Sequence, residues 1–372
     1  MIIGVPKEIK LQEHRIGLTP DSVKILTNKG HEVLIQNDGG YEAGFTNEDY
    51  KNVGAKILDT AKSIYEKAEI IVKVKEPQMD EVKMIKENQI IFTYLHLAAA
   101  KSLTEGLINS KSICIAYETV TDEKGRLPLL APMSAVAGRM SIQAGAHSLE
   151  KNQKGRGLLL GGAPGVEPAN VVILGGGVVG ENAAIIATGM RSKVYIVDKS
   201  KERLKELHSK FGDKIIPSQS DKTDLKKLIS ECDLLVGGVL IPGAEAPKLV
   251  TKEMVKLMKR GSVVVDVAID QGGCVETSKP TTHANPTYLV DEVVHYCVAN
   301  MPGGVPRTST IALNKAILPL LIKLADHGYK KTLEENKNYL AGLNVYKGKV
   351  TCKGVSDALG YEYIPPEKAL QN

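Results

Sequence analysis

Residues 170–184 read NVVILGGGVVGENAA, with three consecutive glycines between strand-forming residues and helix-forming residues. Gly175, Gly177 and Gly180 have the spacing G-x-G-x-x-G. Such a loop is explained either by a tight turn without a ligand or by a backbone surface that receives a pyrophosphate. The motif indicates a dinucleotide only where a strand precedes it, a helix follows it and an acid lies further along the chain.

An acidic residue does follow the glycine loop at a suitable distance. The next apolar run, KVYIVD, ends at Asp198, 18 residues after Gly180, close to the spacing of the acid that binds the adenosine ribose. In this geometry Gly175 makes the turn, Gly177 lets the backbone approach the pyrophosphate, and Gly180 lets helix and strand pack closely. The pyrophosphate would lie at the amino terminus of the helix. Because the carboxylate repels a 2′-phosphate, the sequence favours NAD over NADP.

Short β-branched runs alternate with amphipathic helical segments in two successive series, which is typical of βαβ units. The strand candidates are residues 2–5, 32–36, 69–75, 89–96 and 112–119, then 170–176, 193–198, 233–239 and 262–268. Thr19 and Pro20 predict a helix start, 132–151 a long helix, and the helical pattern after residue 305 is followed by a polar tail. We predict an α/β fold with two Rossmann-like doubly wound parallel-sheet domains and an interdomain cleft. Residues 1–130 plus 305–372 would form the substrate domain, and 131–304 the NAD-binding domain.

The composition suits such a fold. Of 372 residues, 43% are hydrophobic but only 4% aromatic, so the cores must consist mainly of Val, Ile, Leu and Ala. These residues suit strands that are covered by helices on both faces. The net charge of +5 is spread along the chain, without a cluster of Lys and Arg, so no nucleic-acid partner is expected.

The cysteines and apolar runs indicate a cytoplasmic protein. The five cysteines are far apart and contain no CxxC pair, which predicts buried free thiols in a reducing compartment. The start MIIGVPKEIK lacks the apolar region of a signal peptide. No run of about 18 apolar residues occurs, so we expect no membrane span.

Polar side chains follow several predicted strands at their carboxyl ends, where parallel sheets bind ligands. Lys75 and His96 close two runs of the first series, and Arg15 lies in the loop after the first run. Asp270 and Asn300 follow runs of the second series. Taken singly, Lys75 and Arg15 could be solvated charges, and His96 a partly buried histidine. Asp270 could be a turn former before two glycines.

Taken together, these residues suit the oxidation of an amino or hydroxy acid. Arg15 can bind a carboxylate bidentately, and Lys75 can polarise the oxygen or orient the substrate. His96 is the candidate for moving protons, since histidine is the side chain suited to proton transfer near neutrality. Asp270 could share that role or stabilise a developing iminium charge. The other histidines lack the spacing of metal ligands, so we predict no catalytic metal.

Several long stretches, spread over essentially the whole chain, resemble the alanine dehydrogenase family. They are MIIGVPKEIKLQEHRIGLTP, VKVKEP, YLHLAA, LAPMSAVAGRMSIQAGAHSLEK, GGAPGVEPANVVILGGGVVGENAA, VVVDVAIDQGGCVETSKPTTHANPTY and YCVANMPGGVPRTST. The resemblance implies NAD-dependent, reversible oxidative deamination of L-alanine to pyruvate and ammonia, by hydride transfer to nicotinamide and hydrolysis of iminopyruvate, in a homohexamer.

The resemblance also implies roles for individual residues. Arg15 and Lys75 would hold the substrate, and His96 and Asp270 would be the acid/base groups. Besides Gly175, Gly177, Gly180 and Asp270, the implied cofactor contacts are Ser134, Val178, Val179, Asp198, Arg203, Ser220, Val239, Leu240, Val267, Ala268, Ile269, Lys279, Val298, Ala299, Asn300 and Met301.

Three alternatives remain open. The NAD(H)-binding subunit of a proton-translocating transhydrogenase shares this architecture but has a membrane partner and needs no amino-acid carboxylate site. A related imine-forming dehydrogenase of the saccharopine type would take a larger amino acid. A catalytically silent NAD-binding protein would not require Arg15, Lys75, His96 and Asp270. The sequence alone does not fix the size of the substrate pocket.

Overall fold

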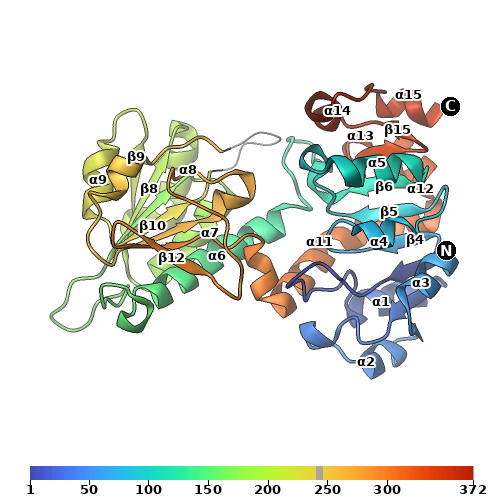
Figure 1. Ribbon diagram of the computed structural model, residues 1–372, viewed down its shortest axis with the longest axis horizontal. Coiled ribbons are helices and arrows are strands. Elements are labelled where there is room, and N and C mark those ends of the chain that lie inside the picture. Colours follow the sequence, from blue (N-terminus) through green and yellow to red (C-terminus); the bar gives the residue numbers. More distant parts are fainter. Residues whose placement is uncertain (240–245, 372) are drawn as a thin grey trace. The chain divides into compact units, whose positions relative to one another are not determined.

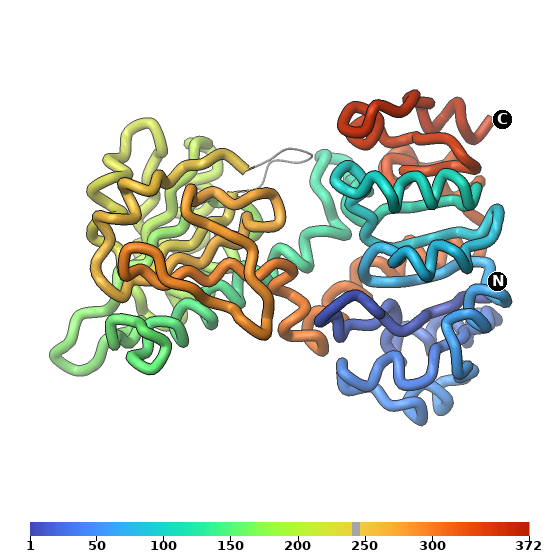
Figure 2. The backbone as a smooth tube through the Cα atoms, viewed as in Figure 1, coloured from blue at the N-terminus to red at the C-terminus, as the bar shows by residue number. Residues whose placement is uncertain are grey.

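A computed structural model describes residues 1–239 and 246–371 (Figure 1). The chain divides into two compact units. Unit 1 comprises Met1–Pro132 and Val305–Asn372, and unit 2 is the continuous segment Met133–Gly304. Figure 2 shows that the blue-to-cyan first segment and the red last segment of the chain lie together in unit 1. Each unit is built on its own sheet.

Unit 1 contains an eight-stranded sheet with the order β15-β14-β6-β5-β4-β1-β2-β3. Its strands are β1 (Ile2–Val5), β2 (Glu32–Gln36), β3 (Lys56–Leu58), β4 (Ile70–Val72), β5 (Ile90–Thr93), β6 (Ile113–Ala116), β14 (Leu343–Tyr346) and β15 (Lys349–Val350). β1 is parallel to both β2 and β4, and pairs Ile3 with Val33 on one side and with Ile70 on the other. β14 runs antiparallel to both β6 and β15.

Helices cover this sheet. They are α1 (Pro20–Asn28), α2 (Asn47–Lys51), α3 (Ala61–Lys67), α4 (Met79–Val82), α5 (Lys101–Asn109), α11 (Pro306–His327), α12 (Tyr329–Glu334), α13 (Lys337–Leu340), α14 (Lys353–Leu359) and α15 (Pro366–Gln371). α1 starts as predicted, since the Thr19 side chain accepts the Ser22 N–H at 3.3 Å and Pro20 is the first helical residue. Ile71, Ile91 and Cys114 pack in one cluster with residues of α3, α4 and α5.

α11 is long and apolar enough to cross a membrane, judged by length and composition alone. Half of its most apolar window is buried within the protein, and the helix contacts α1 and α12 of unit 1. Core helices of globular proteins meet the same criteria, so this single helix is weak evidence for a membrane span.

Two expectations for unit 1 are wrong. The runs 69–75, 89–96 and 112–119 are strands only over their central residues, 70–72, 90–93 and 113–116. The segment after α11 is not a polar tail. It forms four helices and two strands, and β14 extends the sheet by pairing with β6.

Unit 2 contains a seven-stranded sheet with the order β12-β13-β11-β10-β7-β8-β9. Its strands are β7 (Asn170–Leu174), β8 (Lys193–Asp198), β9 (Ile215–Gln219), β10 (Leu234–Gly237), β11 (Val263–Asp266), β12 (Thr287–Val290) and β13 (Val293–Tyr296). The strand order changes direction at β7, which is parallel to β8 on one side and β10 on the other. β12 is antiparallel to β13. The α/β class is confirmed, with the difference that antiparallel strands make both sheets mixed.

The helices of unit 2 cover both faces of its sheet. They are α6 (Ala131–Ser148), α7 (Val178–Gly189), α8 (Lys201–Phe211), α9 (Leu225–Glu231) and α10 (Lys252–Val255). Val171 and Ile173 pack with residues of α6, α7 and α8, whereas Val172 and Leu174 pack with residues of α9 and α10. This double burial explains why β7 is a continuous apolar run.

Candidate nucleotide-binding and catalytic residues

The carboxyl ends of neighbouring strands in unit 1 carry the predicted substrate residues. The order β6-β5-β4-β1 places these strand ends side by side. Arg15 lies in the loop after β1, Lys75 follows β4 and His96 follows β5. The structure therefore brings the three residues to one edge of the sheet. Glu118, which the sequence did not single out, follows β6 at the same edge.

Glu13 orients the Arg15 side chain. The Arg15 Nε donates to Glu13 Oε1 at 2.6 Å, and its Nη2 donates to Glu13 Oε2 at 2.5 Å. The Arg15 side chain is only 2% exposed, so it is not a solvated loop charge. Burial opposes the charge of the guanidinium, but the contacts with Glu13 outweigh this effect and raise the pKa of Arg15. A bidentate pair fixes the guanidinium plane, so unit 1 presents an oriented cation.

A buried ion cluster lies beside Lys75. The Lys73 ammonium is fully buried and lies 2.9 Å from both Glu8 Oε2 and Glu81 Oε1. Burial opposes its charge, but the two carboxylates outweigh burial and raise the pKa of Lys73. Because one ammonium cannot fully compensate two buried carboxylates, burial raises the pKa of Glu8. Lys75 itself is half-buried, and its main-chain carbonyl accepts the Thr93 hydroxyl at 2.9 Å.

His96 projects from the end of β5 in an uncommon backbone conformation. Its φ is +48°, in the left-handed region that few non-glycine residues occupy. Glu118 Oε1 accepts the His96 N–H at 2.6 Å and lies 3.9 Å from the ring Nδ1. The ring stacks on Tyr94, with centroids 5.8 Å apart, and the His96 side chain is 49% exposed. Half of the His96 side chain is thus open to the surroundings, and the other half is covered, as expected of a partly buried histidine.

The glycine loop of unit 2 lies at the switch point of its sheet. Gly175 follows β7 with a φ of +94°, which requires glycine. A Cβ on Gly180 would lie 1.8 Å from the Gly175 carbonyl oxygen, so strand and helix are in direct backbone contact. A Cβ on Gly177 would meet nothing within 4 Å, and no side chain caps the start of α7. The loop therefore combines close packing with an open backbone face at a helix amino terminus.

Asp198 ends β8 beside this loop. Its Oδ2 accepts the Gly176 N–H at 2.6 Å, and its Oδ1 accepts the Ser200 N–H at 2.8 Å. Arg203 of α8 donates from Nε to the Gly176 carbonyl at 2.7 Å and forms an ion pair with Glu181 of α7. Asp198 and Arg203, both predicted as cofactor contacts, thus also help to fix the conformation of the glycine loop.

Asp266 organises the segment that carries Asp270. The Asp266 side chain is fully buried at the end of β11 and accepts the N–H groups of Ala268, Cys274 and Val275 and the hydroxyl of Ser278. Asp270 is exposed, and its Oδ1 accepts the Asn300 N–H at 3.2 Å. Asp270 and Asn300 are therefore brought together, although 30 residues separate them.

The other predicted cofactor residues gather mainly around the same sheet edge. Ser134 lies on α6, Ser220 follows β9 and Val239 follows β10. The buried members are Val179, Ala268, Ile269, Val298 and Met301; Ser134, Val239 and Val267 are half-buried; Val178, Ser220, Lys279 and Ala299 are exposed. Leu240 lies outside the described residues.

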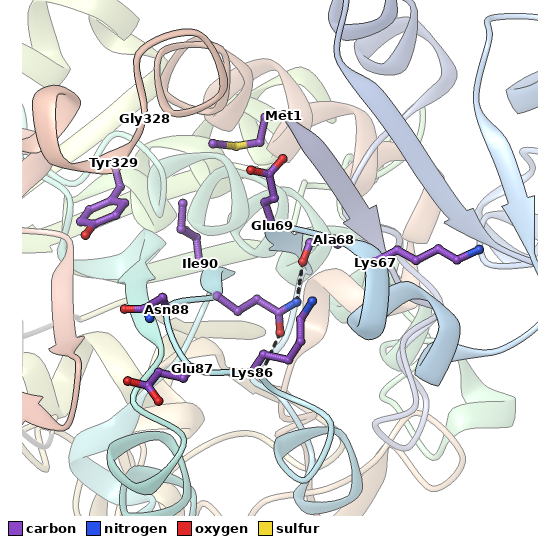
Figure 3. A pocket seen from close by; sticks show the side chains of 11 residues that line it. Met1, Lys67, Ala68, Glu69, Lys86, Glu87, Asn88, Ile90, Gly328 and Tyr329 are labelled. Atoms are coloured by element: carbon purple, nitrogen blue, oxygen red, sulfur yellow. Dashed lines mark hydrogen bonds between the residues drawn. The ribbon is translucent and has the colours of Figure 1, made fainter.

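A cavity of about 440 Å³ lies at the opposite edge of the unit 1 sheet (Figure 3). Met1, Glu69 and Ile90 place it at the amino ends of β1, β4 and β5, away from the predicted substrate residues. Its lining includes side chains of both charge signs, among them Lys67, Lys86 and Glu87. Over residues 1–239 and 246–371, no group of three His, Cys, Asp or Glu side chains is arranged to hold a metal ion.

Sequence reasoning missed Glu8, Glu13, Lys73, Glu81, Glu118 and Asp266. Lys73 had one available signal: it alternates with apolar residues in IIVKVK and so lies where a core side chain is expected. The acidic residues resemble ordinary loop acids in the sequence.

A doubly wound unit with a glycine loop at its switch point defines a nucleotide-binding protein with a Rossmann fold. Residues 4–137 match Alanine dehydrogenase/PNT, N-terminal domain, and residues 141–353 match Alanine dehydrogenase/PNT, C-terminal domain. The chain belongs to the alanine dehydrogenase/PNT family.

Individual relatives agree with this assignment. An alanine dehydrogenase of Halomonas elongata is 54% identical over 98% of both chains, and one of Methanococcus maripaludis is 53% identical over 100% of both. A solved L-alanine dehydrogenase structure has a TM-score of 0.93 and 49% identity over 97% of this chain and 99% of its own. A transhydrogenase structure from Sinorhizobium meliloti has a TM-score of 0.82 at 21% identity, over 94% of this chain and 100% of its own, and so shares the fold.

Proposed function

We propose that this protein catalyses the NAD-dependent, reversible oxidative deamination of L-alanine to pyruvate and ammonia. Relatives that are about half identical over the full length are alanine dehydrogenases. Within the molecule, the observation that carries the proposal is the placement of Arg15, Lys75 and His96 at neighbouring strand ends. In this assignment unit 1 is the substrate domain and unit 2 is the NAD-binding domain.

The side chains of the two units take complementary roles in the proposed reaction. Arg15 and Lys75 hold the carboxylate and the reacting end of alanine or pyruvate. The glycine loop and Asp198 of unit 2 would hold NAD, which would supply the acceptor for the hydride of the alanine α-carbon, so that iminopyruvate would remain for hydrolysis. His96 or Asp270 takes a proton from the water that adds to the imine, and the carbinolamine then collapses to pyruvate and ammonia.

The residues around the glycine loop fit a dinucleotide. The open face at Gly177 and the uncapped start of α7 leave backbone N–H groups for a pyrophosphate. The Asp198 carboxylate, which accepts two main-chain N–H groups, retains acceptor capacity for ribose hydroxyls. We assign the remaining contacts to the cofactor residues named above, Arg203 and Asn300 included.

We also propose a cytoplasmic homohexamer that acts on small molecules, without a metal, a nucleic acid or a membrane partner. The full-length likeness to alanine dehydrogenases supports the small-molecule substrates, and the hexamer is what the family resemblance of the sequence implies. Light scattering on the purified protein tests the hexamer, since the mass should be about six times that of one chain. A monomeric mass for active enzyme would contradict it.

The decisive test of function is NADH oxidation with pyruvate alone, with ammonium alone, and with both. We expect oxidation only when both are present, because reductive amination consumes both. Rates with larger 2-oxo acids would then show how large a side chain the substrate pocket accepts. Oxidation with pyruvate alone would indicate a hydroxy-acid dehydrogenase. Tight NADH binding without turnover under any condition would favour a transhydrogenase-like subunit or a silent NAD-binding protein.

A further inference from the structure

Beyond β4, the segment that carries Lys75 has no strand partner on the β1 side but keeps contact with the chain on the β5 side. β1 pairs with β4 through Ile3 and Gly4 and ends at Val5, so it offers no strand partner to residues beyond Val72. On the other side β5 continues the contact, since the Val74 carbonyl accepts the Tyr94 N–H at 3.3 Å. The main-chain N–H groups of Val74 and Lys75 therefore need acceptors from outside the ladder.

The Glu8 carboxylate supplies those acceptors. Its Oε1 accepts the Val74 N–H at 2.6 Å and the Lys75 N–H at 3.3 Å. Its Oε2 accepts the Lys73 ammonium at 2.9 Å, and the Glu8 side chain is only 2% exposed. One carboxylate thus contacts three consecutive residues at the end of β4. Because Glu8 belongs to the loop that continues to Arg15, it also ties this loop to the strand end that carries Lys75.

We propose that Glu8 is a positioning residue for substrate binding: its carboxylate holds the main chain of Lys75 and so fixes the spacing between the Lys75 and Arg15 side chains. This inference rests on the proposed function only for the identity of the substrate. Glu8 does not touch the reacting atoms in this assignment. Its effect is expected on the affinity for the 2-oxo acid rather than on the affinity for NADH, which binds the other unit.

Glu81 provides a matched control. Its Oε1 is also 2.9 Å from the Lys73 ammonium, and its side chain is 1% exposed. Its Oε2 accepts the Gln78 N–H at 2.8 Å at the start of α4, and its Oε1 is 3.4 Å from the Tyr65 hydroxyl. Replacing Glu8 or Glu81 therefore removes an equivalent partner of Lys73, but only Glu8 contacts the main chain of Val74 and Lys75.

The experiment compares Glu8→Gln and Glu81→Gln in the full-length protein. In Glu8→Gln the amide oxygen should bind the charged Lys73 and turn the NH₂ group towards the Val74 N–H, which breaks the main-chain contacts. Without substrate, hydrogen exchange in a peptide over residues 70–76, which leaves out the Gln78 N–H held by Glu81, should accelerate about tenfold or more for Glu8→Gln but not for Glu81→Gln. With NADH and ammonium saturating, KM for pyruvate should rise about tenfold for Glu8→Gln only. KM for NADH should change by less than about twofold in either variant.

Equal effects of the two variants on exchange and on pyruvate KM would overturn the proposal, because they would reduce Glu8 to a structural partner of Lys73. Unchanged exchange in Glu8→Gln would overturn it as well. If Glu8→Gln does not fold, Glu8→Asp is the second variant. It keeps a negatively charged partner for the Lys73 ammonium, but its shorter side chain does not reach the Val74 N–H, and the same predictions apply. If the wild-type protein does not aminate pyruvate, the proposed function fails, while hydrogen exchange still decides the role of Glu8.

Discussion

At the scale of single residues, the candidate substrate site is a set of basic groups, each held by a carboxylate. Glu13 orients Arg15, Glu8 contacts the end of β4, and Glu118 holds the main chain of His96. A cation that is removed from water needs such compensation. Glu13 fixes the direction of the Arg15 side chain, which lowers the entropic cost of binding a small substrate, whereas Glu8 and Glu118 hold the main chain of Lys75 and His96.

His96→Ala should lower kcat of reductive amination by about 10²- to 10⁴-fold, the usual contribution of a general acid or base. The affinity for NADH should stay within about twofold, because the glycine loop belongs to the other unit. Titration of NADH fluorescence checks this. His147→Ala is the control, since His147 also lies near a carboxylate, 3.3 Å from Glu150, but on an exposed helix surface. A parallel loss of NADH affinity and turnover in His96→Ala would indicate a structural role.

The sequence could locate Arg15, Lys75 and His96 because polar residues at the ends of apolar runs stand out. It could not identify the acids that hold them. Glu8 and Lys73 are 65 residues apart, and His96 and Glu118 are 22 apart, so the pairs form only through the strand order. Neither the left-handed backbone of His96 nor the burial of Arg15 has a local sequence signal.

At the scale of elements, the glycine loop joins β7 to α7 with two different constraints. Gly180 has no room for a side chain, whereas Gly177 faces open space. The sequence predicted the loop well, because strand, glycines, helix and acid all lie within one βαβ unit. It missed β14, since a four-residue strand in a polar region finds its partner, β6, only across more than half of the chain.

Gly180→Ala should lower the free energy of unfolding by about 1–3 kcal/mol, because its Cβ would overlap a backbone oxygen. Gly177→Ala should leave stability nearly unchanged but weaken NADH binding about tenfold or more, since the methyl group would occupy the face assigned to the pyrophosphate. Gly189→Ala, at the open end of the same helix, is the control and should affect neither. Thermal unfolding and NADH titration measure both effects, and unchanged NADH affinity in Gly177→Ala would contradict the assignment.

The buried His295 of β13 should make stability pH-dependent. Its Nδ1 lies 3.0 Å from the Val293 carbonyl and must donate, so its Nε2 accepts the Thr277 hydroxyl at 2.8 Å and the ring is neutral. Burial lowers the pKa of His295 below its usual value of 6.5. The unfolded chain therefore takes up a proton that the folded protein excludes, and stability is lost as pH falls below about 6.5.

Denaturant unfolding at about pH 7.5 and about pH 5.5 measures this effect. His295→Asn should be less stable than the wild type at the higher pH but should lose less stability on acidification. An equally steep pH dependence in both proteins would exclude His295 as the source.

At the scale of the whole molecule, the chain passes between the units twice, after Pro132 and after Gly304. Unit 2 is continuous and has apolar clusters on both faces of its own sheet. We expect residues 131–304, produced separately, to fold and to bind NADH within about tenfold of the full-length affinity, without catalysing amination. Circular dichroism and NADH titration test this. A folded fragment that does not bind NADH would contradict the assignment of the cofactor to unit 2.

The antiparallel pairing of β14 with β6 has a consequence for how the protein is made. A ribosome releases β6 early, but its partner emerges only after the whole of unit 2 has been synthesised. Unit 2 can therefore fold on the nascent chain while β6, at the edge of the unit 1 sheet, still lacks its partner strand β14. An unpaired edge is a template for aggregation, so the interval between these two events is when the newborn polypeptide most needs a chaperone.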